Sequence, residues 1–365
     1  MKWSTLVLTI ILLLSLVMTA TASAAMKPEL PKWEEVFNPT PFPFPGWWAA
    51  DDTALKFKGQ LYFKFFGDYI YDQAWVTPDG ENWSLAWEGP TIDPEFEYFW
   101  PMIIFENQLY LVLRDGDGMY PDRIVRTPDG VSWETVFSAE GNENLWVWFG
   151  RFMSFNDHLF IFAGNWDGTN YSEHLWRSPS GDPGTWEDVD QFSCTMRAYA
   201  TFKDALYMGG EWCEGGVQIW RSYDGAIFEP VTTNGFEIPS NLTVEDIGEK
   251  GGYLYASLTN EEGGQIWRTR NGMDWQPVTT DGLGDPNNFS FTLINYKENV
   301  YAFSESYIGV QVYRSQDGII WEAANEPGWG DPENIFVAES AMLVYKGALY
   351  VSPDGPAGIL RFIEP

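Results

Sequence analysis

The chain has few of the residues that build zinc sites and hydrolytic triads. Its 365 residues include two histidines, His158 and His174, and two cysteines. A zinc site needs three or four Cys, His or carboxylate ligands brought together, and neither histidine has a serine partner for a Ser-His-Asp arrangement. The sequence therefore predicts neither a zinc centre nor a serine-hydrolase triad.

Basic residues are also scarce. Lysine and arginine number 21 against 52 aspartates and glutamates, which gives a formal net charge of −31. Such a field repels nucleic acid and anionic lipid and keeps a protein soluble, so no nucleic-acid partner is expected. A saline habitat would explain the same acidity, so the charge alone is not evidence of a binding site.

Long apolar runs are absent after the first 25 residues. Leu6–Val17 is almost wholly apolar, Lys2 precedes it, and Ala22-Ser23-Ala24 has the form of a cleavage site. This pattern predicts a signal peptide over residues 1–24. No later stretch approaches the ~20 apolar residues of a membrane span. We therefore expect a secreted monomer, extracellular or periplasmic, without a membrane span.

The two cysteines, Cys194 and Cys213, lie in one repeat of the sequence. A hairpin turn near Lys203-Asp204 would pair residue 201 with 206 and bring 194 opposite 213. In an exported protein this arrangement predicts a disulfide. The alternative is a pair of free buried thiols.

What the sequence has is a repeat. A Leu-Tyr dipeptide, or a close variant, recurs at intervals of 46 to 50 residues, at 61, 109, 159, 206, 254, 300 and 349. Strand-rich repeats of this length are typical of propeller blades. The sequence predicts an all-β, seven-bladed β-propeller of four-stranded antiparallel blades, as a single domain over residues 50–365.

The third repeat shows the plan of one blade, with strands A to D in chain order. Short strands separated by Gly, Asn and Asp breaks are expected at Arg151–Phe155, His158–Ala163, His174–Arg177 and Trp186–Val189. The last repeat lacks strand D. Trp33–Phe37, in the N-terminal segment 25–49, matches strand D of the second repeat and is expected to complete the last blade and close the ring.

The C–D turns have a common form, such as Thr77-Pro-Asp-Gly80 followed by Trp83 and Thr127-Pro-Asp-Gly130 followed by Trp133. The Asp accepts hydrogen bonds from the turn, and Gly takes a positive φ. These turns resemble the Asp-box (BNR) repeats of sialidase-type propellers, although Asp and Gly are adjacent here. The resemblance implies the propeller fold and carries little about catalysis, because the motif is a folding device.

Subtracting the repeat leaves candidate functional residues. Eight tryptophans lie outside the expected C and D positions, in or beside the D–A and B–C loops that share one face, at the mouth of the central channel. They are Trp47, Trp48, Trp100, Trp146, Trp148, Trp166, Trp212 and Trp329. Tryptophan faces with nearby carboxylates suit sugars. The alternative is that the tryptophans only pack the loops together.

A ligand-binding set follows from this subtraction. The arginines that recur in strand C are scaffold, whereas two others lie on inner strands near the mouth. The expected set is Trp100, Trp148, Trp166, Trp212, Trp329, Glu97, Arg151, Arg197, Asp167, Glu211 and Glu305. The closely spaced Asp115, Asp117 and Asp122 resemble a calcium-binding loop, and a solvated acidic turn is the alternative.

Three functions fit these residues. The first is a secreted propeller that binds a carbohydrate at the channel mouth. The second is a sialidase-like glycoside hydrolase or lyase, which Arg114, Arg151 and Arg197 would serve by binding a carboxylate, and whose acid pair the sequence cannot identify. The third is a protein-interaction scaffold without catalysis.

Overall fold

The computed structural model describes residues 30–39, 54–65, 72–96, 98–114, 122–138, 146–166, 171–192, 194–213 and 215–363, without the side chains of 146–149, 165, 166 and 171. The expected signal peptide and the two tryptophans Trp47 and Trp48 lie outside the described residues. No helix in the described part has the length and apolarity needed to cross a bilayer.

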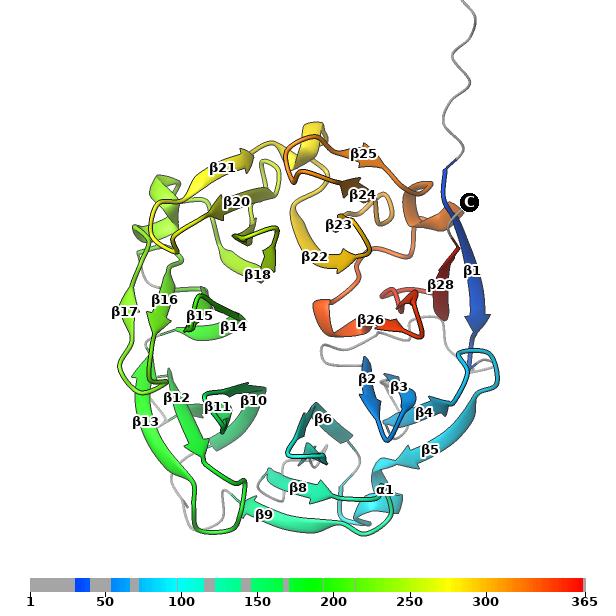
Figure 1. Ribbon diagram of the computed structural model, residues 1–365, viewed down its shortest axis with the longest axis vertical. Coiled ribbons are helices and arrows are strands. Elements are labelled where there is room, and N and C mark those ends of the chain that lie inside the picture. Colours follow the sequence, from blue (N-terminus) through cyan, green and yellow to red (C-terminus); the bar gives the residue numbers. More distant parts are fainter. Residues whose placement is uncertain are drawn as a thin grey trace, which may run out of the picture. The chain divides into compact units, whose positions relative to one another are not determined.

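Residues 31–365 form an all-β propeller of four-stranded antiparallel blades, which confirms the predicted fold class in this form (Figure 1). The described residues contain five sheets of four strands. In chain order they are β2 (Ala54–Phe57), β3 (Gln60–Phe65), β4 (Gln73–Thr77) and β5 (Ser84–Glu88); β6 (Tyr98–Phe105), β7 (Gln108–Arg114), β8 (Arg123–Thr127) and β9 (Glu134–Ser138); β10 (Trp146–Phe155), β11 (His158–Trp166), β12 (Tyr171–Ser178) and β13 (Glu187–Phe192); β22 (Ser290–Tyr296), β23 (Asn299–Glu305), β24 (Val312–Ser315) and β25 (Glu322–Ala323); and β26 (Met342–Tyr345), β27 (Ala348–Val351), β28 (Ile359–Ile363) and β1 (Lys32–Phe37).

The sixth sheet has eight strands in two meanders. The first is β14 (Thr195–Phe202), β15 (Ala205–Glu211), β16 (Ile219–Ser222) and β17 (Glu229–Pro230); the second is β18 (Thr243–Lys250), β19 (Tyr253–Thr259), β20 (Gln265–Thr269) and β21 (Gln276–Thr279). A single residue pair, Glu211 with Thr243, joins the meanders. One short helix, α1 (Gly89–Ile92), and four 3₁₀ turns, η1 (Asn234–Glu237), η2 (Gly282–Gly284), η3 (Pro327–Gly330) and η4 (Glu339–Ala341), lie between strands.

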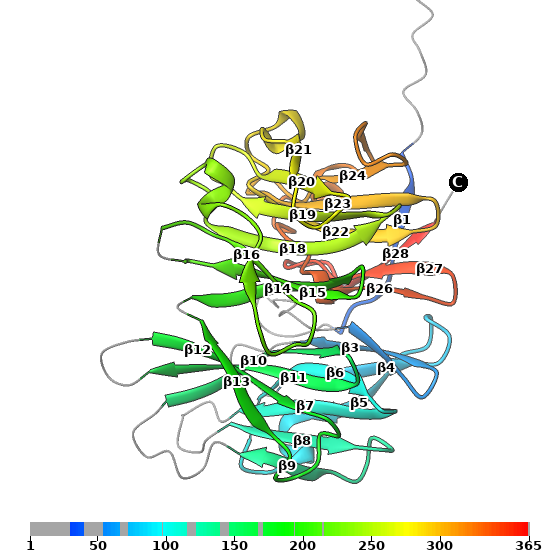
Figure 2. The same cartoon turned by 60° about the vertical axis from the view of Figure 1, so that its left-hand side comes forward.

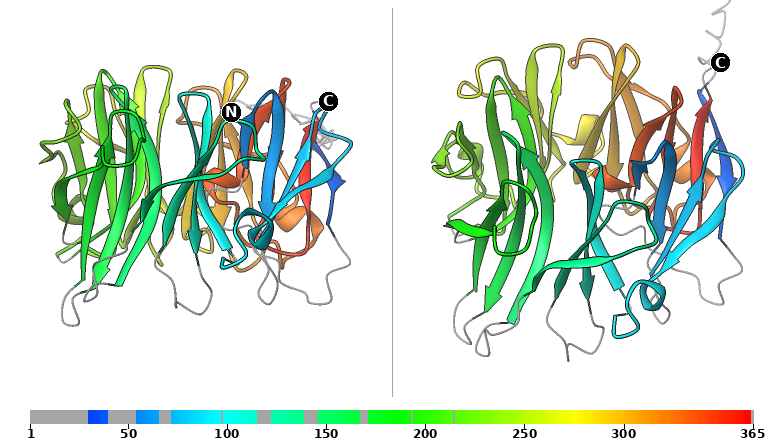
Figure 3. Two further views of the ribbon diagram at one scale, coloured as in Figure 1. Left: turned by 90° about the horizontal axis from the view of Figure 1, so that it is seen from below. Right: turned by 60° about the horizontal axis from the view of Figure 1, so that its bottom comes forward.

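The first strand of each unit faces the centre of the ring, and the strands run from one face of the ring to the other (Figures 1 and 3). Neighbouring sheets lie against one another as successive layers (Figure 2). Second strands are buried on both sides because they lie between neighbouring layers, and their sequences are apolar to match: Gln108–Arg114 reads QLYLVLR and has five consecutive buried residues.

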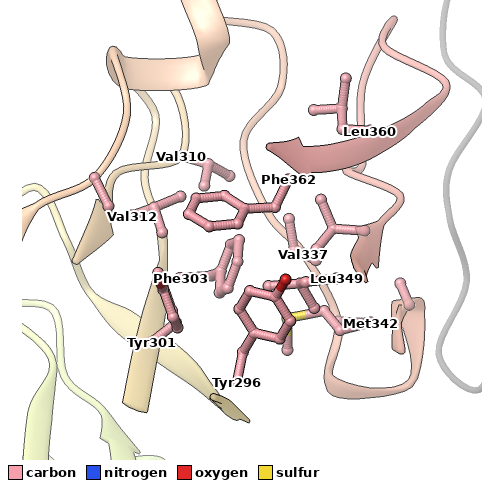
Figure 4. Packing of buried hydrophobic residues seen from close by; sticks show 14 residues of the cluster. Tyr296, Tyr301, Phe303, Val310, Val312, Val337, Met342, Leu349, Leu360 and Phe362 are labelled. Carbon is pink, nitrogen blue, oxygen red and sulfur yellow. The ribbon is translucent and has the colours of Figure 1, made fainter. Parts of the chain in front are cut away.

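The N-terminal strand β1 pairs with β28, the last strand of the chain, so residues from both ends complete one sheet. Trp33 lies opposite Phe362, and its ring packs against Phe362 at 4.9 Å and Phe303 at 5.9 Å between ring centroids. Figure 4 shows this core, in which side chains from β23, β24 and β28 meet. The pairing of β1 with β28 covers the sheet edge that an open propeller would expose, and the buried aromatic side chains stabilise this closure.

The tyrosine of the repeated dipeptide packs on the next C–D turn. A Cβ added to Gly272 would lie 1.8 Å from the Tyr207 hydroxyl oxygen, and one added to Gly318 would lie 2.0 Å from that of Tyr255. Both glycines have a positive φ, so the turn needs glycine for its backbone and for the room it leaves. The dipeptide and the turn motif therefore form one contact between successive units.

The C–D turns are held by their own side chains. The Thr77 hydroxyl accepts a hydrogen bond from the Gly80 amide at 2.9 Å, and the Asp79 carboxylate accepts from the amides of residues 81 and 82. These amide bonds, chiefly from Asn82, hold the pKa of Asp79 well below its usual range. The same bonds recur at Thr127 and Asp129.

Candidate functional site

Four neighbouring inner strands carry a β-bulge at the same height. The pairing register shifts between Phe99 and Met102 in β6, Phe149 and Phe152 in β10, Met196 and Ala198 in β14, and Val244 and Asp246 in β18. The bulged residues are Trp100-Pro101, Gly150-Arg151, Arg197 and Glu245. Among the described residues, strand β22 pairs with β23 through this height without a shift, whereas the described pairings of β2 and β26 end before it. Bulges re-aim side chains and are frequent beside active sites, so this half of the ring is the candidate site.

Two of these bulges are joined by an ion pair. Arg197 Nε lies 3.0 Å from both carboxylate oxygens of Glu245, and its Nη2 lies 2.6 Å from Oε1. The Glu245 side chain is only 7% exposed and that of Arg197 21%. A two-point guanidinium–carboxylate contact at this burial is strongly directional. It fixes the two side chains against each other between the two meanders of the eight-stranded sheet.

Asp246 follows the bulged glutamate and is buried. One of its carboxylate oxygens, Oδ2, accepts a hydrogen bond from the Leu293 amide of β22 at 2.5 Å. Burial raises the pKa of Asp246 to about 7, and the neighbouring Glu245 charge adds to the rise, whereas the Leu293 amide and Arg151 oppose it. This carboxyl group therefore exchanges its proton near neutral pH.

Arg151 is the charged residue of the β10 bulge and is 8% exposed. Next to it, a Cβ on Gly150 would lie 3.6 Å from an oxygen of Glu173, a residue of β12 that is 3% exposed. Buried charges persist in proteins when they are paired and hydrogen-bonded. The β10 bulge therefore adds a cation and a nearby carboxylate to the row.

A second set of ion pairs lies beside β6. Lys64 Nζ and Asp72 Oδ2 are 2.9 Å apart, and both side chains are almost fully buried. The same Asp72 oxygen accepts the Phe99 amide at 2.9 Å, whereas Asp72 Oδ1 has no hydrogen-bond partner in the described residues. Burial raises the pKa of Asp72 despite the Lys64 ammonium. Arg114 binds Asp122 at 2.7 Å and lies 6.0 Å from the centre of the Trp100 ring.

The structure brings some of the expected ligand-binding residues together. Trp100, Arg151 and Arg197 all lie in the bulge row. Aligned on the ends of their strands, the two arginines are one position out of register, and the bulges occur at these offset positions. Arg151 and Arg197 therefore differ by one position in the repeat because the strand pairing shifts locally at each bulge.

Other expected residues lie elsewhere. Trp212 is exposed on the β15–β16 loop, and Glu211 pairs with Thr195 and Thr243. The Glu305 carboxylate accepts the Ser290 hydroxyl at 3.0 Å. Trp329 packs on Trp33 at 5.5 Å, within the core beside the last sheet.

The backbones of Trp148 and Trp166 lie on β10 and β11, where Trp166 pairs with Trp146 and Tyr171. Both strands extend further than the expected Arg151–Phe155 and His158–Ala163. Glu97 and Asp167 lie outside the described residues.

The expected calcium loop is described only in part. Asp115 and Asp117 lie outside the described residues, and Asp122 is held by Arg114. Within the part of the chain that the structure describes, no three His, Cys, Asp or Glu side chains are grouped so as to hold a metal ion. The described donors therefore do not fit a metal, and no chemical step is assigned to one.

Cys194 and Cys213 form a disulfide with an S–S distance of 2.07 Å. Thr201 pairs with Leu206, the register expected for this hairpin. The bulge at Arg197 then shifts the pairing by one residue, so Thr195 lies opposite Glu211. The disulfide closes the end of the hairpin beside the bulge.

Several residues of the site were not among those expected from the sequence: Lys64, Asp72, Glu173, Glu245 and Asp246. For Lys64 the signal is a charged residue inside an otherwise apolar strand, in the run LYFKFF, whereas Glu173, Glu245 and Asp246 lie in strands with other polar residues and carry no such signal. A charge at such a position is costly unless it is paired. Its partner is often far away in the sequence, which hides the pair.

Comparison with known proteins shows the fold. No family model matches the chain, and no curated protein matches it. An oligogalacturonate lyase solved in complex with manganese is similar over 93% of this chain and 94% of its own, with a TM-score of 0.62 and 10% identity. The β-propeller domain of the Trilobed protease from Pyrococcus furiosus (75% and 79% covered, TM-score 0.48, 10% identity) and a thermostable family-43 glycoside hydrolase (65% and 94% covered, TM-score 0.39, 12% identity) are more distant.

Proposed function

We propose that this chain is a secreted propeller that binds a carbohydrate at the channel mouth, on the bulged half of the ring. The observation that carries the proposal is the row of bulges at one height in four adjacent inner strands. Three of them hold Arg151, Arg197 and Glu245, and the fourth holds Trp100. Guanidinium groups donate and carboxylates accept hydrogen bonds, and together with an aromatic face they match the hydroxyls and apolar face of a sugar ring.

The two meanders of the eight-stranded sheet are taken as two blades, because the strand pairing between them consists of one residue pair among the described residues. This gives the seven blades that the repeat predicts. Their C–D turns support membership of the Asp-box (BNR) class, with a variant spacing. Export rests on the signal-peptide pattern over residues 1–24.

The similarity to an oligogalacturonate lyase supports a carbohydrate as the class of ligand, and it makes galacturonate oligomers a suitable first probe. It also favours the alternative that this chain cleaves a glycan, as a lyase or a glycoside hydrolase. Carboxyl groups of the bulge row would then act as the acid and base that cleave the glycan. A protein-interaction scaffold is the third candidate, for which the mouth would be a contact surface.

A glycan array with a parallel assay for cleaved products tests the proposal. The purified mature chain is applied to neutral and acidic glycans, galacturonate oligomers included, with and without added Ca²⁺ or Mn²⁺. Binding without product formation supports a binding propeller, and product formation supports the enzyme alternative. The absence of binding and of turnover on every glycan class would overturn the carbohydrate proposal.

A further inference from the structure

Two aromatic side chains are exposed on the loops between the second and third strands of their units. Trp212, on the β15–β16 loop, is 69% exposed, and Tyr307, on the β23–β24 loop, is 79% exposed. These loops share the face on which the inner strands begin, because antiparallel strands return to it. Tyr307 is not among the ligand-binding residues expected from the sequence. A large aromatic ring that is open to solvent offers a flat apolar face to a ligand.

The backbone of Trp212 is held in place. Its φ of 52° is a left-handed conformation that bulky residues rarely adopt. The Trp212 amide donates to the Leu242 carbonyl at 3.1 Å, and the next residue, Cys213, is linked to Cys194. The loop therefore presents the indole from an anchored backbone position, which lowers the entropy lost when a ligand binds.

Tyr307 is held by an aromatic neighbour whose ring is tilted against its own. Its ring lies 4.8 Å from that of Phe289, with an angle of 32° between the ring planes. Phe289 covers one side of the tyrosine, and the high exposure of Tyr307 leaves its other side open to solvent. The amide of the preceding Ser306 donates to the Ile335 carbonyl at 2.9 Å. The result is a flat platform of fixed orientation.

The loop between these two carries carboxylates. Glu261 and Glu262 are exposed on the β19–β20 loop, which lies between the loops of Trp212 and Tyr307 in the order of strands around the ring (Figure 1). We infer that Trp212 and Tyr307 form a rim subsite for an extended glycan, whose sugar rings stack on the two aromatics and whose hydroxyls donate to the carboxylates between them.

The chemistry of the rim selects this occupant. Glu261 and Glu262, together with the chain's net charge of −31, repel an anionic lipid surface or an acidic protein. A chain of neutral sugars has no charge for that field to repel, and it has apolar faces that aromatic rings cover well. Packed sheets are roughly 10 Å apart, so loops two units apart are separated by about 20 Å, which is more than a single sugar ring spans.

The inference rests on the proposed function, and the test separates the two. Affinity gel electrophoresis with neutral polysaccharides and polygalacturonate is combined with titration of a disaccharide and a long oligomer of the polymer that retards the chain most. The variants are Trp212→Ala, Tyr307→Ala and, as a control, Tyr223→Ala. Tyr223 is 58% exposed on a C–D turn, at the opposite face.

We expect each rim variant to lose roughly threefold to tenfold in affinity for the polymer and long oligomer, the worth of one aromatic contact, with the disaccharide affinity unchanged. The Tyr223 variant should bind like the parent, and melting temperatures should match because the replaced rings are exposed. Rim variants with parental polymer affinity, or an equal loss for the disaccharide, would overturn the rim subsite and leave the channel site standing. A parent chain that no polysaccharide retards would overturn both.

Discussion

Tyr207 and Gly272 interlock across two successive units of the ring. Gly272 has a φ of +78°, and a Cβ at this residue would lie 1.8 Å from the tyrosine hydroxyl oxygen. Successive units thus meet through a tyrosine of the Leu-Tyr repeat and a glycine of the C–D turn. The two strongest periodic features of the sequence are the two halves of one contact.

This contact makes Gly272→Ala a destabilising change for two reasons. The alanine is strained at a positive φ, and its methyl group collides with Tyr207. Gly184→Ala separates the two effects, because Gly184 also has a φ of +78° and a Cβ there meets nothing within 4 Å. We expect a loss of about 1 kcal/mol for Gly184→Ala from strain and about 2–4 kcal/mol for Gly272→Ala, measured by denaturant unfolding. Equal losses would show that the Tyr207 contact does not matter.

The disulfide shortens a loop of the unfolded chain. Cys194 and Cys213 are 19 residues apart in sequence, and closing a loop of that size contributes roughly 3 kcal/mol. The double variant Cys194→Ser/Cys213→Ser should unfold at correspondingly lower denaturant concentration, and a reducing agent should lower the stability of the parent but not of the variant. A parent whose stability is insensitive to reduction would contradict this.

Asp246 should make stability depend on pH. Its pKa is about 7 in the folded chain, against an ordinary value of 3.8. The folded state therefore binds more protons between these values, so the contribution of this group to stability is present below pH ~4 and is lost as pH rises to about 7.

Asp246→Asn removes this titration. The stability of the variant relative to the parent should increase by on the order of 1 kcal/mol per pH unit between pH 5 and 7. Asp224→Asn is the control, because backbone amides lower the pKa of Asp224 and its titration lies in the acid range. A difference between Asp246→Asn and the parent that is flat over pH 5–8 would show that Asp246 is ionised throughout.

The fold was predictable from the sequence because its signals are local and repeated. The turn from Thr77 to Gly80 contains its own hydrogen-bond partners, and the Leu-Tyr strands alternate with it at even spacing. The candidate site was predictable only in part. Arg151, Arg197 and Trp100 stood out as residues that the repeat does not explain.

The rest of the site depends on contacts that no local pattern encodes. Glu245 lies 48 residues from Arg197, and a bulge in each strand brings them together. A bulge is a one-residue change of pairing that depends on the neighbouring strand. Trp329 shows the reverse case: it matches no repeat position, yet it packs against Trp33, 296 residues earlier in the chain, and so lies in the core.

The most direct test of the carbohydrate site is the affinity of Glu245→Gln for the glycan that binds best on the array. The variant removes a counter-charge of the partly buried Arg197. Its free energy of unfolding should be lower by about 3 kcal/mol, so binding is measured under conditions where the variant remains folded. Arg314→Gln is the control, since Arg314 pairs with Glu322 in an exposed ion pair on outer strands.

Titration calorimetry of the three proteins gives the answer. We expect Glu245→Gln to lose roughly tenfold to a hundredfold in affinity, the worth of hydrogen bonds to a charged group, and Arg314→Gln to bind like the parent. Parental affinity in a folded Glu245→Gln would contradict the proposal that the bulged half of the ring is the carbohydrate site.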